Sequence, residues 1–172
     1  MLERFYPDRL EDSTYDIDFE DLYRSGKRGI LFDIDNTLVE HGADSDERSE
    51  ALFKRLAAIG FKSCLISNND EERVKRFNKN INTLYVCKAG KPSGRGYLEG
   101  IKKMGVGLNE TVFIGDQLFT DVYGAKRLGI SNICVKPIDK HEEIQIILKR
   151  RLEYIVFKSY ARKLKHDKNK KS

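Results

Sequence analysis

"LFDIDNTLVE", residues 31–40, places two carboxylates, Asp33 and Asp35, directly after an apolar run. A surface loop has no need of such an apolar approach, and a buried, isolated carboxylate is very costly. The two acids therefore require partners, and the rest of the chain indicates what those partners are.

Short apolar, β-branched runs recur along the chain and have the composition of buried strands. Helical patterns separate them, the clearest with a capping box at Asp44 and Glu47 and an end at Gly60. Strands that alternate with helices predict right-handed βαβ units. The predicted fold is therefore α/β: a three-layer α/β/α sandwich around a parallel, five-stranded, Rossmann-like sheet, with strands at residues 29–33, 62–66, 83–87, 111–115 and 131–135.

The composition is typical of one cytoplasmic globular domain: 172 residues, of which 40% are hydrophobic and 34% charged. No apolar run approaches the roughly 20 residues that a membrane-spanning helix needs. Residues 1–13 lack the apolar region of a secretory signal. The cysteines stand singly in apolar stretches, which favours reduced core thiols over a catalytic role: Cys64, Cys87 and Cys134.

Polar side chains follow four of the predicted strands, at the edge where parallel sheets bind ligands. Taken singly, each has an ordinary explanation as a turn, a helix cap or a solvated lysine. Together and in this order they favour phosphoryl transfer with Mg²⁺, because hard carboxylate oxygens suit that cation and several neighbouring acids need one. The candidates are Asp33 and Asp35 after the first strand, Ser67 and Asn68 after the second, Lys91 after the third, and Asp116 and Asp121 after the fourth.

Four motifs resemble those of haloacid dehalogenase (HAD) superfamily phosphatases: DIDNT (33–37), ISN (66–68), KP (91–92) and GDQLFTD (115–121). Longer strings such as GILFDIDNTLV, RVKRF and IGDQLFTDVYGAKRLG resemble more narrowly the YqeG-like family of HAD subfamily IIIA, which is related to phosphatidylglycerophosphate phosphatases. The resemblance extends from about residue 7 to about residue 153. It implies the HAD fold and a phosphatase that depends on Mg²⁺.

The resemblance also implies a division of roles among the acids. Asp33 would be the nucleophile that takes the phosphoryl group as an aspartyl-phosphate, and Asp35 would protonate the leaving oxygen and then activate water. Lys91 would stabilise the charge on the nucleophile and on the phosphoryl group. Mg²⁺ would be held by Asp33, Asp116 and the backbone carbonyl of Asp35, and Asp121 would position Lys91 or a metal-bound water.

By the same resemblance, Thr37 would orient the loop after the first strand, and Ser67 and Asn68 would bind the substrate phosphate. The spacing of the motifs is also informative. About 30 residues separate Thr37 from Ser67 and about 20 separate Ser67 from Lys91, too few for the cap domains of other family members. The expected fold therefore has no cap domain, and its site is open to a large or surface-bound substrate.

The last part of the chain is basic. Residues 149–172 contain ten Lys or Arg and two acids, a net charge of +8, against −3 for the remainder. A phosphatase domain is expected at residues 1–156, with a helical lead-in at 1–27, and a basic tail at 157–172. The helical periodicity changes near residue 157, which predicts a break or a reorientation there. The segment before the break would pack on the domain through Ile144, Ile147, Leu148, Leu152, Ile155 and Val156.

Three interpretations of the basic tail stay open: a solvated terminus, contact with an anionic membrane, and binding of nucleic acid. Peripheral contact of residues 157–171 with the inner face of a membrane fits a lipid substrate, and no specific nucleic acid is predicted. The predicted function is Mg²⁺-dependent phosphomonoester hydrolysis on a phospholipid headgroup, phosphatidylglycerophosphate. One alternative is a phosphatase for a soluble sugar phosphate, nucleotide or phosphoprotein. The other is a non-catalytic HAD module that binds RNA or a ribosome, and the oligomeric state stays open.

Overall fold

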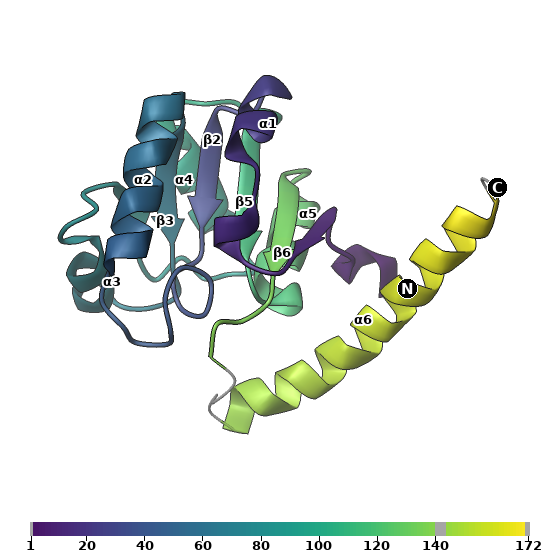
Figure 1. Cartoon of the computed structure of the whole chain (residues 1–172). Helices are drawn as coiled ribbons and strands as arrows, with labels where there is room; N and C mark the ends of the chain where they lie inside the picture. Colours follow the sequence, from purple (N-terminus) through teal and green to yellow (C-terminus); the bar gives the residue numbers. More distant parts are fainter. Residues whose placement is uncertain (1, 140–143, 171–172) are drawn as a thin grey trace.

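A parallel sheet organises the chain in the computed structural model, which describes residues 2–139 and 144–170, with the side chains of the last helix described from 151 to 167. The strands lie in the order β1-β6-β5-β2-β3-β4, and every neighbouring pair is parallel (Figure 1). They are β1 (Arg9–Glu11), β2 (Gly29–Phe32), β3 (Lys62–Ile66), β4 (Leu84–Val86), β5 (Thr111–Gly115) and β6 (Ser131–Val135).

Helices cover both faces of the sheet and complete three layers. Ile30 and Phe32 of β2 belong to the core on the side of α1, α2 and α3, whereas Leu31 belongs to the core with Tyr97 of α4 and Ala125 of α5. This alternation follows from the two-residue period of a strand that is buried on both faces. The helices are α1 (Phe19–Arg24), α2 (Glu47–Ile59), α3 (Glu71–Asn78), α4 (Gly94–Met104), α5 (Tyr123–Arg127) and α6 (Ile144–Lys170), with shorter turns η1 (Leu2–Phe5), η2 (Thr14–Asp16) and η3 (Leu118–Val122).

The five predicted strands are confirmed to within one residue at each end, but the sheet has a sixth strand that the sequence did not predict. This strand, β1, lies within the segment 1–27, which was expected to be helical. Its place at the sheet edge is fixed by buried Asn132, whose backbone N and Nδ2 both donate to Asp8 Oδ2, at 3.0 and 2.9 Å. Asp8 N donates in return to Asn132 Oδ1 at 3.1 Å.

The helix α2 shows how the sequence sets the length of a connection. Asp46, rather than Asp44, is its N-cap: Asp46 Oδ1 accepts from Ser49 N at 2.8 Å, and Ser49 Oγ accepts from Asp46 N at 2.9 Å. The predicted end at Gly60 is confirmed, with a φ of 110° that favours glycine. Along residues 2–139, α2 is the helix between β2 and β3 and α3 the helix between β3 and β4, so the predicted uncapped architecture is confirmed.

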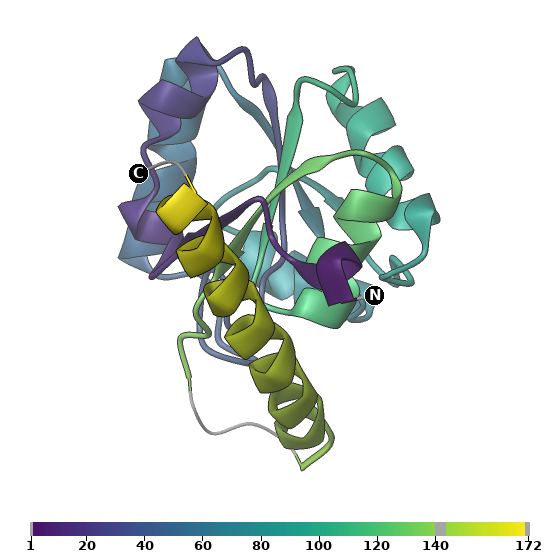
Figure 2. The ribbon, with the colours of Figure 1, turned by 90° about the vertical axis from the view of Figure 1, so that its right-hand side faces the viewer.

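The last helix, α6, runs without interruption through residue 157, so the break predicted there is wrong. Figure 2 views the molecule from the side of α6 and shows it beside the N-terminal segment. The hydroxyls of Tyr6 and Ser159 lie 2.7 Å apart, and Lys163 Nζ donates to a carboxylate oxygen of Glu3 at 2.7 Å. None of the helices within the described ranges is long and apolar enough to cross a bilayer.

The face that α6 turns toward the sheet also differs from the prediction. Val156 is buried as expected, but Leu152 and Ile155 are each 58% exposed. Glu153 is buried in their stead, because its carboxylate accepts a hydrogen bond at 2.7 Å from Leu118 N, at the start of η3. A helix start leaves backbone N–H groups without partners, and Glu153 satisfies one of them. The predicted contacts of three other side chains lie outside the described residues: Ile144, Ile147 and Leu148.

Candidate active site

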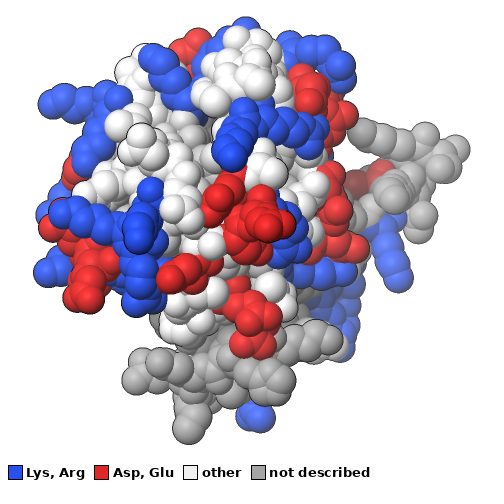
Figure 3. Space-filling model, turned by 60° about the vertical axis from the view of Figure 1, so that its left-hand side comes forward, with Lys and Arg blue, Asp and Glu red and all other residues white. Residues whose placement is uncertain are grey.

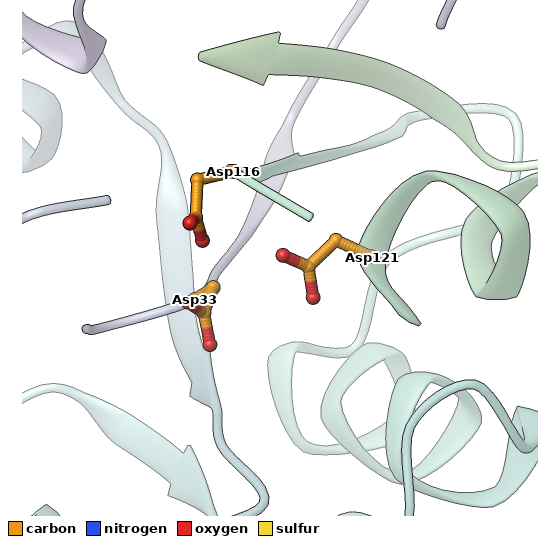
Figure 4. Close-up of side chains that lie close together, drawn as sticks. All are labelled: Asp33, Asp116 and Asp121. Carbon is orange, nitrogen blue, oxygen red and sulfur yellow. The ribbon is translucent and has the colours of Figure 1, made fainter. Parts of the chain in front are cut away.

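The segments that follow β2, β3, β4 and β5 meet at one edge of the sheet. There, Lys91 Nζ donates to Asp33 Oδ1 at 2.6 Å and to Asp121 Oδ1 at 2.8 Å. Asp116, which follows β5, completes an acidic cluster: one carboxylate oxygen from each of the three aspartates lies within 4.8 Å of the others. Figure 4 shows the three side chains around a common space. Residues up to 88 positions apart therefore form one polar site.

One lysine does not balance the three carboxylates of this cluster, and all four residues are buried. Burial raises the pKa of the Asp33 carboxyl to about 6, although neighbouring Lys91 acts to lower it. Burial also acts to lower the pKa of Lys91, but the carboxylates of Asp121 and Asp33 outweigh it and hold that pKa above its usual value. Lys91 therefore stays charged, and the site still favours additional positive charge.

The donor atoms of the cluster fit a divalent cation. Thr37 Oγ1 lies 3.2 Å from Asp116 Oδ1 and 3.4 Å from Asp33 Oδ2, and donates between the two carboxylates. Asp33, Asp116 and Asp121 supply only hard oxygen ligands, which suit Mg²⁺ better than zinc or copper. Asp121 also holds Lys91, the arrangement that its predicted positioning role requires.

The carboxylate of Asp35 has its own set of donors. Its Oδ1 accepts from Gly42 N and from Arg73 Nη2, both at 2.8 Å, and its Oδ2 accepts from Asn69 Nδ2. Burial alone would raise the pKa of this carboxyl, but these hydrogen bonds outweigh it and hold the pKa below its usual value. Asp35 is therefore oriented and ionised, which is the state of a base; acting as an acid requires these contacts to loosen.

Arg73 is a site residue to which the sequence analysis gave no role. It lies in the first turn of α3, and its ion pair with Asp35 joins two side chains that are only 11% and 14% exposed. Its Nε and Nη1 atoms are buried without a hydrogen-bond partner among the described residues. The string RVKRF marked the region, but an ion pair between residues 38 positions apart leaves no local signal.

Tyr97 is a second residue that the sequence analysis missed. It is buried in α4, and its hydroxyl donates to the backbone carbonyl of Thr120 at 2.7 Å. Burial raises the pKa of this phenol, so it remains a hydrogen-bond donor. The contact holds η3 in place, and η3 carries Asp121 into the site. A buried tyrosine needs such a partner for its hydroxyl.

A pocket of about 200 Å³ opens on these groups. It brings together the predicted residues that face the substrate with five polar residues from the same loops that were not predicted, namely Asn36, His41, Asn69, Gln117 and Thr120. Its size and polar walls suit a phosphate group better than a whole large substrate. The predicted residues in its wall are Asp33, Asp35, Ser67, Asn68 and Lys91.

Two residues predicted to bind phosphate differ in their surroundings. Ser67 Oγ accepts from Asn69 N at 3.1 Å, which leaves the hydroxyl hydrogen able to point into the pocket. The side chain of Asn68 holds the Lys91 loop instead: its Oδ1 accepts from Lys91 N at 2.7 Å, and its Nδ2 donates to Lys91 O at 3.2 Å. Phosphate binding by Ser67 and Asn68 stays a prediction, and this geometry favours Ser67.

Comparison with known proteins identifies the family to which this fold belongs. A family model described as "Hydrolase: haloacid dehalogenase-like hydrolase" matches residues 44–129. A Bacillus subtilis protein named "Probable phosphatase YqeG" is 33% identical over 165 residues, which is 95% of this chain and 96% of that protein. The chain belongs to the haloacid dehalogenase-like hydrolase family, and within that family it is a phosphatase.

The chain is also similar to a plant phosphatase in sequence and to a bacterial hydrolase in fold. The Arabidopsis thaliana protein "Phosphatidylglycerophosphate phosphatase 1, chloroplastic/mitochondrial" is 30% identical over 90% of this chain, which spans about half of that protein (47%). The crystal structure of a HAD-superfamily hydrolase from Ehrlichia chaffeensis superposes with a TM-score of 0.53 at 16% identity, over 63% of this chain and 91% of that one. The second similarity shows a shared fold. Phosphatases of this family generally use a divalent metal, and the buried acidic cluster fits one.

Proposed function

We propose that the chain is a Mg²⁺-dependent phosphomonoesterase that works through an aspartyl-phosphate on Asp33. The observation that carries this proposal is the position of Lys91 Nζ, 2.6 Å from Asp33 and 2.8 Å from Asp121 within a cluster of buried carboxylates. Buried acids in such number are costly to the fold, which is expected where they serve a site. A module that only binds RNA would have no use for the oriented Asp35 beside them.

In the proposed reaction, a carboxylate oxygen of Asp33 attacks the phosphorus, and the bond from phosphorus to the alcohol oxygen breaks. Asp35, protonated for this step, gives its proton to the leaving oxygen. It then takes a proton from water, which attacks the phosphorus of the aspartyl-phosphate and releases inorganic phosphate and free Asp33. Lys91 and Ser67 hold phosphoryl oxygens throughout. Mg²⁺, held by Asp33, Asp116 and the backbone carbonyl of Asp35, would neutralise the charge on those oxygens.

The proposed substrate is a phospholipid headgroup, with phosphatidylglycerophosphate as the first choice. A relative that is 30% identical over 90% of this chain carries that substrate in its name. The uncapped fold supports the choice, since a lid would exclude a headgroup that is still anchored in a bilayer. The small polar pocket admits the phosphate while the rest of the lipid stays outside. A soluble sugar phosphate, nucleotide or phosphoprotein is the alternative that the assay must distinguish.

Phosphate release from a panel of esters tests this function. Phosphatidylglycerophosphate in mixed micelles should be preferred over sugar phosphates, nucleotides and a phosphopeptide, and EDTA should abolish turnover until Mg²⁺ is added. Asp33→Asn serves as the blank, and Asp21→Asn, at an exposed position of α1, is the matched control that should keep full activity. Turnover by Asp33→Asn would refute the covalent route, and indifference to EDTA would refute the metal assignment.

The proposal includes peripheral contact between α6 and the inner face of an anionic membrane, in a cytoplasmic protein. Lys158, Arg162 and Lys165 are exposed on α6, and each basic residue near an anionic surface contributes about 1 kcal/mol. By contrast, basic and acidic side chains are interspersed on the face seen in Figure 3. This difference favours α6 as the surface that meets the lipid.

Sedimentation with vesicles tests the contact. Wild-type protein should bind vesicles that contain phosphatidylglycerol and release them as salt rises, because exposed charge interactions are screened. Charge reversal at Arg162 and Lys165 is preferable to deletion of residues 157–172, since that segment also contacts Glu3 and Tyr6. Equal binding by the wild type and the reversed variant would exclude α6 as the membrane surface.

A further inference from the structure

A second pocket, much larger than the one at the acids, lies between α6 and the edge of the sheet formed by β1 and β6. Its volume is about 730 Å³, within the range of sites that bind whole small molecules. Figure 2 views the molecule from the side of α6, the helix that contributes one wall of the pocket. Its apolar walls include Leu10 of β1, Val135 and Pro137 at the end of β6, and Phe157, Ala161 and Leu164 of α6.

The walls of this pocket are more apolar than a solvent-facing groove requires. Leu10 is 43% exposed and Leu164 is 45% exposed, and both line the pocket. Apolar side chains gathered around one hollow are typical of a binding surface, whereas single exposed leucines are ordinary. Tyr160 lines the pocket, and its ring packs 5.2 Å from the Tyr6 ring in a cluster that includes buried Val156. The hollow is therefore part of the packed structure.

The pocket also adjoins the phosphoryl site. Asp116 contributes to its wall, and the carboxylate of the same residue accepts from Thr37 inside the acidic cluster. The short segment that joins β5 to η3 thus has the metal-binding acids on one side and the apolar pocket on the other. Asp116 is thus the residue that links the apolar pocket to the acidic cluster.

The charges around the pocket indicate which apolar molecule it suits. Three charged residues line its wall, Asp116, Glu153 and Lys136; Glu153 accepts from Leu118 N, and Lys136 Nζ pairs with Asp12 at 2.6 Å. Around the mouth, Lys158, Arg162 and Lys165 are exposed on α6, the helix that forms one side. An apolar hollow with a basic border complements a molecule that has a hydrocarbon chain and an anionic head. A neutral apolar ligand would gain nothing from the border, and a free sugar phosphate would gain nothing from the hollow.

We infer that the pocket between α6 and the β1–β6 edge binds an acyl chain of the phospholipid whose phosphate is hydrolysed at Asp33. This inference rests on the proposed function for the identity of the headgroup. It adds a site that selects the substrate by the length of its acyl chain. The enzyme takes one acyl chain out of the bilayer or micelle while the phosphate reaches the acids.

Chain-length dependence tests the inference. Diacyl lipid phosphates with chains of four to eight carbons, used as dissolved monomers, should show a KM that falls about fourfold for each methylene buried. Ala161→Trp and Leu10→Trp fill the pocket from opposite walls and should flatten this dependence. Ile155→Trp, which adds the same ring to the exposed face of α6, is the matched control and should keep the slope. An unchanged slope in both filled variants would overturn the inference.

Direct binding separates this inference from the proposed function. Dihexanoyl phosphatidylglycerol has acyl chains but no phosphomonoester. Its binding to the full-length protein, measured by calorimetry, therefore does not depend on turnover. If no lipid phosphate is hydrolysed and this probe still binds to the wild type and not to Ala161→Trp, acyl-chain binding in the pocket is supported and the proposed substrate is refuted. If the filled variants instead convert a dimer to a monomer and the wild type binds no probe, the pocket is a subunit interface and the inference is refuted.

Discussion

Replacing Asp33 by asparagine should make the metal-free protein more stable at neutral pH while it removes activity. The reason is that burial raises the pKa of the Asp33 carboxyl from 3.8 to about 6. At about 1.4 kcal/mol for each pH unit, keeping this group ionised in the fold costs about 3 kcal/mol. Asparagine has nearly the same shape and no charge, so this cost disappears.

A competing effect has to be weighed. Removing one partner of a buried ion pair is usually destabilising, because the other charge is left unpaired. Here Lys91 keeps Asp121 at 2.8 Å after the substitution, so its charge stays compensated. In the free energy of unfolding, the relief of repulsion among the carboxylates therefore outweighs the loss of the ion pair between Lys91 and Asp33, whose atoms lie 2.6 Å apart.

The sign of the pH dependence follows from the direction of the shift. A group whose pKa is raised on folding favours the fold below its unfolded pKa, and this contribution is lost as the pH rises through the folded pKa. Wild type and Asp33→Asn should therefore melt at similar temperatures near pH 4. Above pH 6 in EDTA, the variant should melt about 6 to 12 °C higher, which is the shift that about 3 kcal/mol gives for a chain of this size.

Thermal melts at pH 4 and 7.5, with EDTA or with Mg²⁺, measure this effect. Mg²⁺ should raise the melting temperature of the wild type at pH 7.5 and reduce its difference from Asp33→Asn, since a bound cation compensates the same charge. Asp21→Asn should match the wild type throughout. An Asp33→Asn protein that melts at or below the wild type at pH 7.5 in EDTA would refute the electrostatic reasoning.

Three other perturbations test separate parts of the structure. Arg73→Ala should lower the turnover of alkyl phosphates at least about tenfold and that of p-nitrophenyl phosphate much less: without Arg73 the Asp35 carboxyl is easier to protonate but is no longer held in position, and only the alkyl leaving group needs its proton; equal losses would contradict a positioning role. A thiol-reactive dye should label Cys87 alone in the native protein, since the other two thiols are buried, and three thiols in guanidinium; early labelling of a second thiol would show an open core. Gly96→Ala should lower the free energy of unfolding by about 1–3 kcal/mol in urea titrations, because its Cβ would lie 2.6 Å from the Cβ of Ala89, whereas substitution of exposed Leu98 should not.

The central strands and the site were predictable because their signals are local. A strand such as β2 is buried on both faces, so it reads as a continuous apolar run. Asp33 and Asp116 follow such runs directly, and parallel strands bring their ends to one edge. The sequence therefore predicted which residues the fold would bring together, including Lys91.

The features that were missed depend on contacts between distant residues. The strand β1 is three residues long and only partly buried, so "RLE" carries no strand pattern of its own. The pairing of Arg73 with Asp35 is likewise invisible before the chain is folded. The predicted orientation of α6 was wrong. Hydrophobic periodicity placed Leu152 and Ile155 on the buried face, whereas Glu153 is buried because its carboxylate accepts a hydrogen bond from Leu118 N.

The pairing of β1 with β6 determines when the first strand can join the sheet during synthesis. Asp8 and Asn132, which fix that pairing, are 124 positions apart. At typical rates of synthesis, roughly 6 to 25 s pass between the emergence of the first strand from the ribosome and that of its partner. Through this interval β1 lacks its partner strand β6, and Leu10 and the aromatic residues of the same segment are left without their packing partners. A nascent chain stalled before residue 131 should therefore keep its first residues sensitive to protease and available to chaperones, even when β2 and β3 are already paired.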